Sequence, residues 1–484
     1  MKKIQNSLKH NFVMNIILTM SSFIFPLITF PYISRILLPI GTGKVSFAIS
    51  LISYFSMFAQ LGIPIYGVRA CATVRDQKEE LTKTAHELLI INIGMNCISY
   101  IALTIVIFTF PKLYHDKMLY IFISLNIILT SLGMEWLYKA LEQYTYITVR
   151  SIIFKFIALI ATFLLVHDQK DYIIYGGITV LASSASNICN ILNVHKYIDV
   201  KPVGKYNYKR HLKPVCIFFA MSCAATVYTH LDTVMLGLMS TDTDVGYYNA
   251  AVKIKTILVS IVTALGTVLL PRLSYYIENG KVYDFKKITK KALNFVFLIS
   301  VPMMVYFICF AKEGIYFLSG MAYTNSIIPM QLIMPTLLLI GLTNILGIQI
   351  LVPLGKERIV LHSEMWGALT DIIANIILIP QYKSIGAAIG TLIAESVVFF
   401  VQCRALKSEL GELFKTVHYK KLIIAIALSS IASLWVKILG FGNLLTLLVS
   451  AILFFGVYIG FLWISKEELL IEIFDKIIGR LIHT

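Results

Sequence analysis

Residues 11–34 read NFVMNIILTMSSFIFPLITFPYIS, a run without a single charged side chain. A transmembrane helix needs about 20 mostly apolar residues, so this stretch is long enough to cross a bilayer. Hydrophobic residues make up 58% of the 484 positions and charged residues only 14%, whereas a soluble domain has about 25% charged residues. A water-soluble fold could not bury that much apolar surface. The chain is therefore predicted to be an all-α polytopic membrane protein.

Similar apolar runs recur along the whole sequence, separated by short polar segments. They predict about fourteen transmembrane helices, at residues 11–34, 43–67, 84–110, 118–138, 148–167, 172–195, 214–239, 246–270, 288–311, 324–353, 361–380, 387–403, 422–439 and 444–464. Several of these runs contain proline or glycine. Membrane helices tolerate both, because neighbouring helices can satisfy the backbone groups that are freed.

The distribution of positive charge provides a test of this span count. With the N-terminus in the cytoplasm, the inner segments hold most of the 42 Lys and Arg residues, as the positive-inside rule requires. A wrong count would scramble this asymmetry from some point onward. The sequence therefore predicts an even number of spans with both termini cytoplasmic. The formal net charge of +16 then reflects topology and contact with anionic lipid headgroups, and it requires no nucleic-acid partner.

The chain is expected to form two six-helix lobes joined by a polar linker that acts as a hinge. Gly43 and Gly246 open two weakly similar strings, which suggests lobes related by a pseudo-two-fold axis along the membrane normal. The predicted parts are an N-terminal lobe at 1–195, a basic cytoplasmic linker at 196–213, a C-terminal lobe at 214–404, and two further spans with a cytoplasmic tail at 405–484.

Motifs of enzymes and of metal sites are missing from the sequence. It has no GxxxxGK[ST] phosphate loop, and the pair at 86–87, His-Glu, is not continued to HExxH. The seven cysteines are scattered and form no CxxC pair, so neither a disulfide nor a metal centre is expected. An enzymatic function therefore has no positive support, although membrane glycosyltransferases can have diffuse signatures, and no cofactor is expected.

Ionisable residues at membrane depth are the candidate functional residues, because a charge inside a bilayer is costly. Asp232 and Lys253 would lie roughly 10 Å below the outer surface on adjacent antiparallel helices. They form either a cavity-lining ion pair or a structural salt bridge. Lys155, within the fifth span, either faces a wet cavity or snorkels to the interface. Arg35 ends the first span on the outer side, against the charge bias, where it could hold an anionic group.

Acidic residues within the spans are candidates for ion coupling. Glu135 and Lys139 are four residues apart at the inner end of the fourth span, which favours a local ion pair. Asp371 and Glu395 lie near mid-depth of the eleventh and twelfth spans. Burial favours the neutral form of a carboxylate, which would suit proton coupling. Hydrogen bonding between helices is the alternative role.

Several strings resemble the Wzx-type flippases of polysaccharide repeat units, which serve O-antigen and capsule synthesis. The most specific region is 26–69, with PLITFPYISR at 26–35 and LGIPIYGVR at 61–69. The similarity continues in EWLY at 135–138, DTVMLG at 232–237, VGYYNA at 245–250 and GAAIGT at 386–391. It covers about residues 10–400. The wider superfamily, which includes multidrug antiporters and lipid II flippases, shares two six-helix lobes.

The resemblance implies a substrate and a transport cycle. An undecaprenyl-diphosphate-linked oligosaccharide would move between leaflets of the bacterial cytoplasmic membrane by alternating access. Its sugar head would need a polar cavity, because unpaired polar groups are costly in hydrocarbon. Arg35, Lys155 and Lys253 would supply positive charge for the diphosphate. An H+ or Na+ gradient would drive the cycle, with Asp371 or Glu395 as the proton carrier. Protein partners would be the polymerase and the chain-length regulator of the same pathway.

Two alternatives share the expected fold, namely a cation-coupled drug antiporter and a lipid II flippase. A drug antiporter would be expected to prefer acidic residues in its cavity, whereas lysines and an arginine lie in or beside these spans. A membrane polysaccharide polymerase is the alternative from another class. It should have a large extracytoplasmic loop, and every predicted outer segment of this chain is short.

Overall fold

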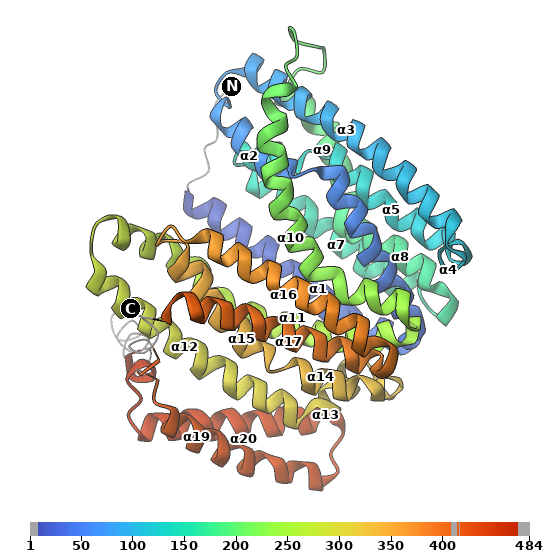
Figure 1. Cartoon of the computed structure of the whole chain (residues 1–484). Coiled ribbons are helices and arrows are strands. Elements are labelled where there is room, and N and C mark those ends of the chain that lie inside the picture. Colours follow the sequence, from blue (N-terminus) through green and yellow to red (C-terminus); the bar gives the residue numbers. More distant parts are fainter. Residues whose placement is uncertain (1–7, 408–413, 416, 473–484) are drawn as a thin grey trace. The chain divides into compact units, whose positions relative to one another are not determined.

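The computed structural model describes residues 8–407, 414–415 and 417–472 of the chain. Every regular element in these ranges is a helix, which confirms the all-α prediction (Figure 1). Large apolar side chains remain exposed on the helices. On α3 (Lys78–Thr109), Ile98, Ile101, Ile105 and Phe108 form an exposed stripe at helical spacing. An apolar stripe of this kind is typical of a surface that contacts lipid.

Packing contacts divide the chain into two compact units, Met1–Gly246 and Tyr247–Thr484. In the first unit, α1 packs against α3, α5, α7 and α10, and α2 packs against α6. The helices of this unit are α1 (Leu8–Gln60), α2 (Ile63–Thr73), α3, α4 (Pro111–His115), α5 (Lys117–Leu132), α6 (Glu135–Ala140), α7 (Tyr144–Leu165), η1 (Gln169–Asp171), α8 (Tyr172–Val180), η2 (Leu181–Ala185), α9 (Asn187–Asn193), η3 (Val194–Lys196) and α10 (Lys209–Met239).

The boundary between the two units falls inside α11 (Asp242–Glu278), so the first residues of α11 belong to the first unit and the rest to the second. In the second unit, helices α16 and α17 lie side by side, as do α19 and α20 (Figure 1). The remaining elements are α12 (Val282–Cys309), α13 (Ala311–Leu318), η4 (Met321–Ser326), α14 (Ile327–Ile333), α15 (Thr336–Thr343), η5 (Asn344–Leu351), α16 (Glu357–Tyr382), α17 (Ser384–Ala405), α19 (Tyr419–Leu434), η6 (Trp435–Leu439) and α20 (Asn443–Ile464).

The first two predicted spans form one long helix with a break. Inside α1, Leu38 leaves the helical conformation, with φ 57° and ψ 178°. Pro39 follows it, and the residue before a proline is disfavoured in helical geometry because the proline ring crowds its backbone. The sequence therefore places the break between the two spans without a separate loop.

A second break separates α1 from α2 at Leu61 and Gly62, which both have positive φ. Gly62, with φ 72°, is also in close contact with α10. A Cβ atom added there would lie 2.4 Å from the backbone nitrogen of Phe219. Glycine is thus required twice at this position, first for the left-handed conformation and second for the close approach of another backbone.

The break at Leu38 lies against the start of α11. A Cβ atom on Gly43 would lie 1.7 Å from the carbonyl oxygen of Asp242, and one on Gly246 would lie 2.0 Å from the carbonyl oxygen of Pro39. Both clashes would be with backbone, which cannot rotate away as a side chain can. These two glycines allow the segments to touch.

The number of spans is only partly defined by the helices. Ten helices in the described ranges are long and apolar enough to cross a membrane, or up to twelve if each of two bent pairs forms one span. One of the ten, His10–Thr73, has 64 residues and contains both of the first two predicted spans. At 1.5 Å per residue it is about three times as long as the ~30 Å hydrocarbon core is thick. α16 is not among the ten, although it contains the predicted span 361–380.

The predicted total of about fourteen spans and the cytoplasmic position of both termini therefore stay predictions. The ends of the chain, residues 1–7 and 473–484, lie outside the described residues. The predicted parts 1–195, 196–213, 214–404 and 405–484 also stay predictions, because packing alone does not tell which helices move together. By packing, α10 belongs to the first unit.

Candidate functional site

Lys155 is a buried cation on α7, with 9% of its surface exposed. Its ammonium group donates hydrogen bonds to the hydroxyl groups of Ser21, at 2.8 Å, and Ser22, at 2.9 Å, both on α1. Within the described ranges, no carboxylate forms an ion pair with it. Glu135 attracts this ammonium electrostatically but pairs directly with Lys139 and Arg150, and a buried charge without a directly paired counter-charge is costly. This position can therefore gain free energy by receiving an anion.

Glu135 belongs to a charged cluster rather than to a single pair. Its carboxylate contacts the Lys139 ammonium at 2.9 Å, as predicted from the spacing, and also the Arg150 guanidinium at 2.8 Å. Arg150 is 5% exposed and donates further hydrogen bonds to Ser186, at 2.7 Å, and Asn187, at 2.9 Å. The cluster joins α6, α7 and α9. The sequence analysis did not select Arg150, although it falls at the start of the predicted span 148–167, because its partners lie on other helices.

A second ion pair connects the turns at the same end of these helices. Arg75, between α2 and α3, lies 2.6 Å from the carboxylate of Glu142, between α6 and α7. This carboxylate raises the pKa of the Arg75 guanidinium above its usual value, through the hydrogen bond and the opposite charge. Both side chains are largely exposed, so the pair contributes little to stability.

The remaining predicted substrate residues have different environments. Arg35 is exposed on α1, and its guanidinium donates to the carbonyl oxygen of Pro31. Asp232 is buried on α10 in the first unit, whereas Lys253 is exposed on α11 in the second unit. The predicted pairing of Asp232 with Lys253 stays a prediction.

In the second unit, Asp371 and Glu395 lie buried on the packed helices α16 and α17. Asn375, one turn beyond Asp371, donates to its carboxylate at 3.3 Å. Gly390 on α17 makes room for this pair, because a Cβ atom there would lie 2.4 Å from the Asn375 side-chain oxygen and 3.2 Å from Asp371. Thr391, the next residue, shares a hydrogen bond with the Tyr248 hydroxyl at 2.9 Å.

This arrangement brings a carboxylate oxygen and an amide oxygen close together at the α16–α17 contact. Such oxygens suit a proton or a hard cation. In the described part of the chain, no group of three or more His, Cys, Asp or Glu side chains could hold a metal ion. The roles of Asp371 and Glu395 in coupling stay predictions.

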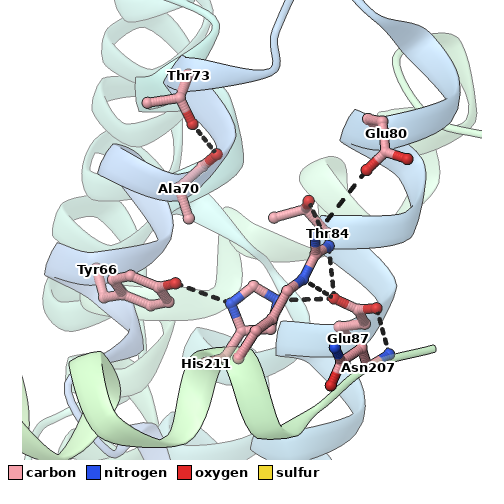
Figure 2. A network of polar contacts seen from close by, with 9 residues as sticks. Tyr66, Ala70, Thr73, Glu80, Thr84, Glu87, Asn207 and His211 are labelled. Atoms are coloured by element: carbon pink, nitrogen blue, oxygen red, sulfur yellow. Dashed lines mark hydrogen bonds and ion pairs between the residues drawn. The ribbon is translucent and has the colours of Figure 1, made fainter.

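A polar network that sequence reasoning did not select lies between α2, α3 and α10 (Figure 2). Glu87 is fully buried, and its carboxylate contacts the imidazole of His211 at 2.7 Å and the guanidinium of Arg210 at 2.7 Å. The Tyr66 hydroxyl contacts the other ring nitrogen of His211 at 2.9 Å. A signal was available in the sequence, because Glu87 falls inside the predicted span 84–110.

Two packed units of long apolar helices define an α-helical multi-pass membrane protein. The solved structure of the lipid II flippase MurJ, in an inward closed conformation, has this fold with a TM-score of 0.73 and 18% identity, covering 95% of this chain and 100% of that chain. An inward-facing multidrug resistance transporter of the MATE family gives a TM-score of 0.65 with 12% identity, covering 84% of this chain and 99% of that chain. At these identities the similarity is one of fold alone.

The chain belongs to the polysaccharide biosynthesis protein family, whose profile matches residues 8–277. The MatE profile matches residues 218–377. A protein of Escherichia coli (strain K12) named "Putative O-antigen transporter" is 26% identical over 81% of this chain and 95% of its own length. A protein of the same name from Shigella dysenteriae is 26% identical over 83% of this chain and 100% of its own length.

These findings confirm the predicted family resemblance and the predicted class of fold. They assign the chain to the bacterial inner membrane as a multi-pass protein of polysaccharide biosynthesis. The relatives are named as transporters, and a solved structure of similar fold is named as a flippase.

Proposed function

We propose that this chain is a flippase that moves undecaprenyl-diphosphate-linked oligosaccharide repeat units from the inner to the outer leaflet by alternating access. Membership of the polysaccharide biosynthesis family and the names of the O-antigen transporter relatives support this proposal. It makes the chain a transporter rather than an enzyme. Neither O-antigen nor capsule is favoured as the final polymer.

The main structural support for the proposal is that the Lys155 ammonium is buried and, in the part of the chain that the structure describes, hydrogen-bonded only to hydroxyl groups. In the described ranges no carboxylate forms an ion pair with this ammonium. A substrate diphosphate could therefore provide its directly paired anion. A hydrogen bond between an ammonium and a phosphate oxygen is charge-assisted and stronger than a neutral one. Arg35 and Lys253 would add positive charge, and Asp232 would orient Lys253 during passage.

Ion coupling is the second part of the proposal. Asp371, with Asn375 and Thr391 nearby, would take up H+ or Na+, and Glu395 on the neighbouring helix is the alternative carrier. Glu135 is the least suited of the three candidates, because its two cationic partners already balance its charge. The polymerase and the chain-length regulator would receive the translocated lipid-linked unit.

The test is deletion of this gene in its own host, followed by complementation with the wild-type chain and with Lys155→Gln. Removal of one charge-assisted contact, about 1.5–3 kcal/mol, predicts a fall of about tenfold or more in the rate at which lipid-linked oligosaccharide reaches the outer leaflet. The matched control is Lys170→Gln, which removes an exposed lysine and should leave the rate unchanged.

Two outcomes would contradict the proposal in different ways. If the deletion strain accumulates no lipid-linked oligosaccharide in the inner leaflet, the function itself is wrong. If Lys155→Gln is present at the normal level and transports at the wild-type rate, Lys155 does not contact the substrate.

A further inference from the structure

The polar segment predicted as a hinge, 196–213, contacts α3 at two places, at Asp199 and at residues 206–211. The Asp199 carboxylate forms an ion pair with the Lys78 ammonium at 2.5 Å. The backbone nitrogen of Asp199 donates a hydrogen bond to the Thr82 hydroxyl at 3.2 Å. Further along the segment, the Tyr206 hydroxyl contacts His86 at 3.0 Å. Lys78, Thr82 and His86 are spaced four residues apart, so they lie along one face of α3.

The end of the segment is held by the buried network around Glu87 (Figure 2). The backbone nitrogen of Asn207 donates to the Glu87 carboxylate at 2.6 Å. Arg210 donates to the same carboxylate at 2.8 Å and to the Thr84 hydroxyl at 3.2 Å. A backbone amide, a guanidinium and an imidazole thus all contact one fully buried carboxylate.

The hydrogen-bond pattern defines how His211 is oriented. In the tautomer that carries its proton on Nε2, Nδ1 accepts from the Tyr66 hydroxyl and Nε2 donates to Glu87, while the Arg210 Nε lies 3.2 Å from the same Nε2. His211 is 3% exposed, so water does not compete for either ring nitrogen. Within the described ranges, Arg210 has one further carboxylate partner, Glu80, at 4.0 Å.

We propose that Glu87 is a positioning residue that keeps residues 199–211 attached to α3 throughout the transport cycle. Detachment would strip a buried carboxylate of all its partners at once, which is costly for a charged group. The linker and the first turn of α10 therefore act as part of the first unit and not as a free hinge.

Pro214 follows this anchor by three residues within α10. A proline inside a helix lacks the N–H that would bond to the carbonyl four residues earlier, here Arg210, so it permits bending. The nearest place at which α10 can bend is therefore just beyond the anchored turn. This inference rests on the proposed function only in assuming that a transport cycle exists.

The first test locks the anchor covalently in a cysteine-free background. Cysteines are introduced by Thr82→Cys and Asp199→Cys, because the Asp199 backbone nitrogen lies 3.2 Å from the Thr82 hydroxyl, and formation of the disulfide on oxidation is verified before transport is measured. We expect the oxidised protein to transport lipid-linked oligosaccharide within about twofold of the reduced protein. Transport that is lost on oxidation and restored by reduction would overturn the proposal, because the segment would then have to detach.

The second test measures attachment without transport. In purified protein, amide hydrogen exchange of the peptide containing residues 203–211 should be about tenfold faster, or more, in Glu87→Gln than in wild type. The control is Glu79→Gln, an exposed carboxylate on the same helix, which should leave exchange unchanged. Unchanged exchange in Glu87→Gln would overturn the anchor. Because this readout needs no substrate, it remains decisive if the flippase function fails.

Discussion

At the scale of single residues, Arg150 is a buried side chain whose loss should reduce stability. It is buried and bonds to Glu135, Ser186 and Asn187. Arg150→Met would leave the Glu135 carboxylate with one partially exposed cation. Breaking a fully buried ion pair from one side costs about 3–5 kcal/mol, and the loss here should be smaller because Glu135 is 34% exposed and keeps Lys139 as a partner. We therefore expect a loss of about 1–3 kcal/mol of unfolding free energy, measured by denaturant unfolding in detergent micelles.

The matched control is Lys139→Gln, which removes the other cation from the same carboxylate. Lys139 is 39% exposed at its side chain, so we expect a loss below about 1 kcal/mol. The double variant Arg150→Met with Glu135→Met should be more stable than Arg150→Met alone, because the carboxylate that lost its buried cation is also removed and the cation that remains, Lys139, is partly exposed to solvent. Equal losses for Arg150→Met and Lys139→Gln would show that the guanidinium is not the main partner of Glu135.

At the scale of the elements, the break between α1 and α2 depends on Gly62. Gly62→Ala would place a methyl group 2.4 Å from the Phe219 backbone in a residue with φ 72°. A residue forced into an unfavourable backbone conformation costs on the order of 1–3 kcal/mol, and the clash adds to this. Thermal unfolding of the purified variant should therefore begin at a lower temperature than that of wild type.

Gly94→Ala provides the comparison for this variant. Gly94 lies within α3, and a Cβ atom there would meet nothing within 4 Å. Alanine is favoured over glycine in a helix interior by about 1 kcal/mol. This variant should be as stable as wild type or more stable. Similar destabilisation by both substitutions would mean that Gly62 has no special role at the break.

At the scale of the whole molecule, the charge asymmetry predicts which segments face the cytoplasm. Lys205, in the basic linker, should be inside, whereas Lys170, in η1, should be outside. In a cysteine-free background, Lys170→Cys should react with a membrane-impermeant thiol reagent in cells whose inner membrane is intact, and Lys205→Cys should react only after the membrane is opened. The reverse pattern would invert the predicted topology.

Composition and periodicity were sufficient to predict the class of fold, because a lipid-facing helix must be apolar over its whole length. The i,i+4 pair of Glu135 and Lys139 was also predictable, since both residues belong to one helix. Arg150 and the Glu87–His211 contact were not, because each joins segments whose packing depends on helix breaks such as those at Leu38 and Gly62. Hydropathy averages over such breaks, so it gave spans but not the partners of buried charges.

Gly43 and Gly246 open the two weakly similar strings of the sequence. In the structure, each lies against the carbonyl four residues before the other, Gly43 on Asp242 and Gly246 on Pro39. The contact is thus reciprocal, and a methyl group on either side would act as a wedge between the same two backbones. Part of the likeness between the two strings is therefore a steric requirement of one shared crossing, so shared ancestry is not its only explanation.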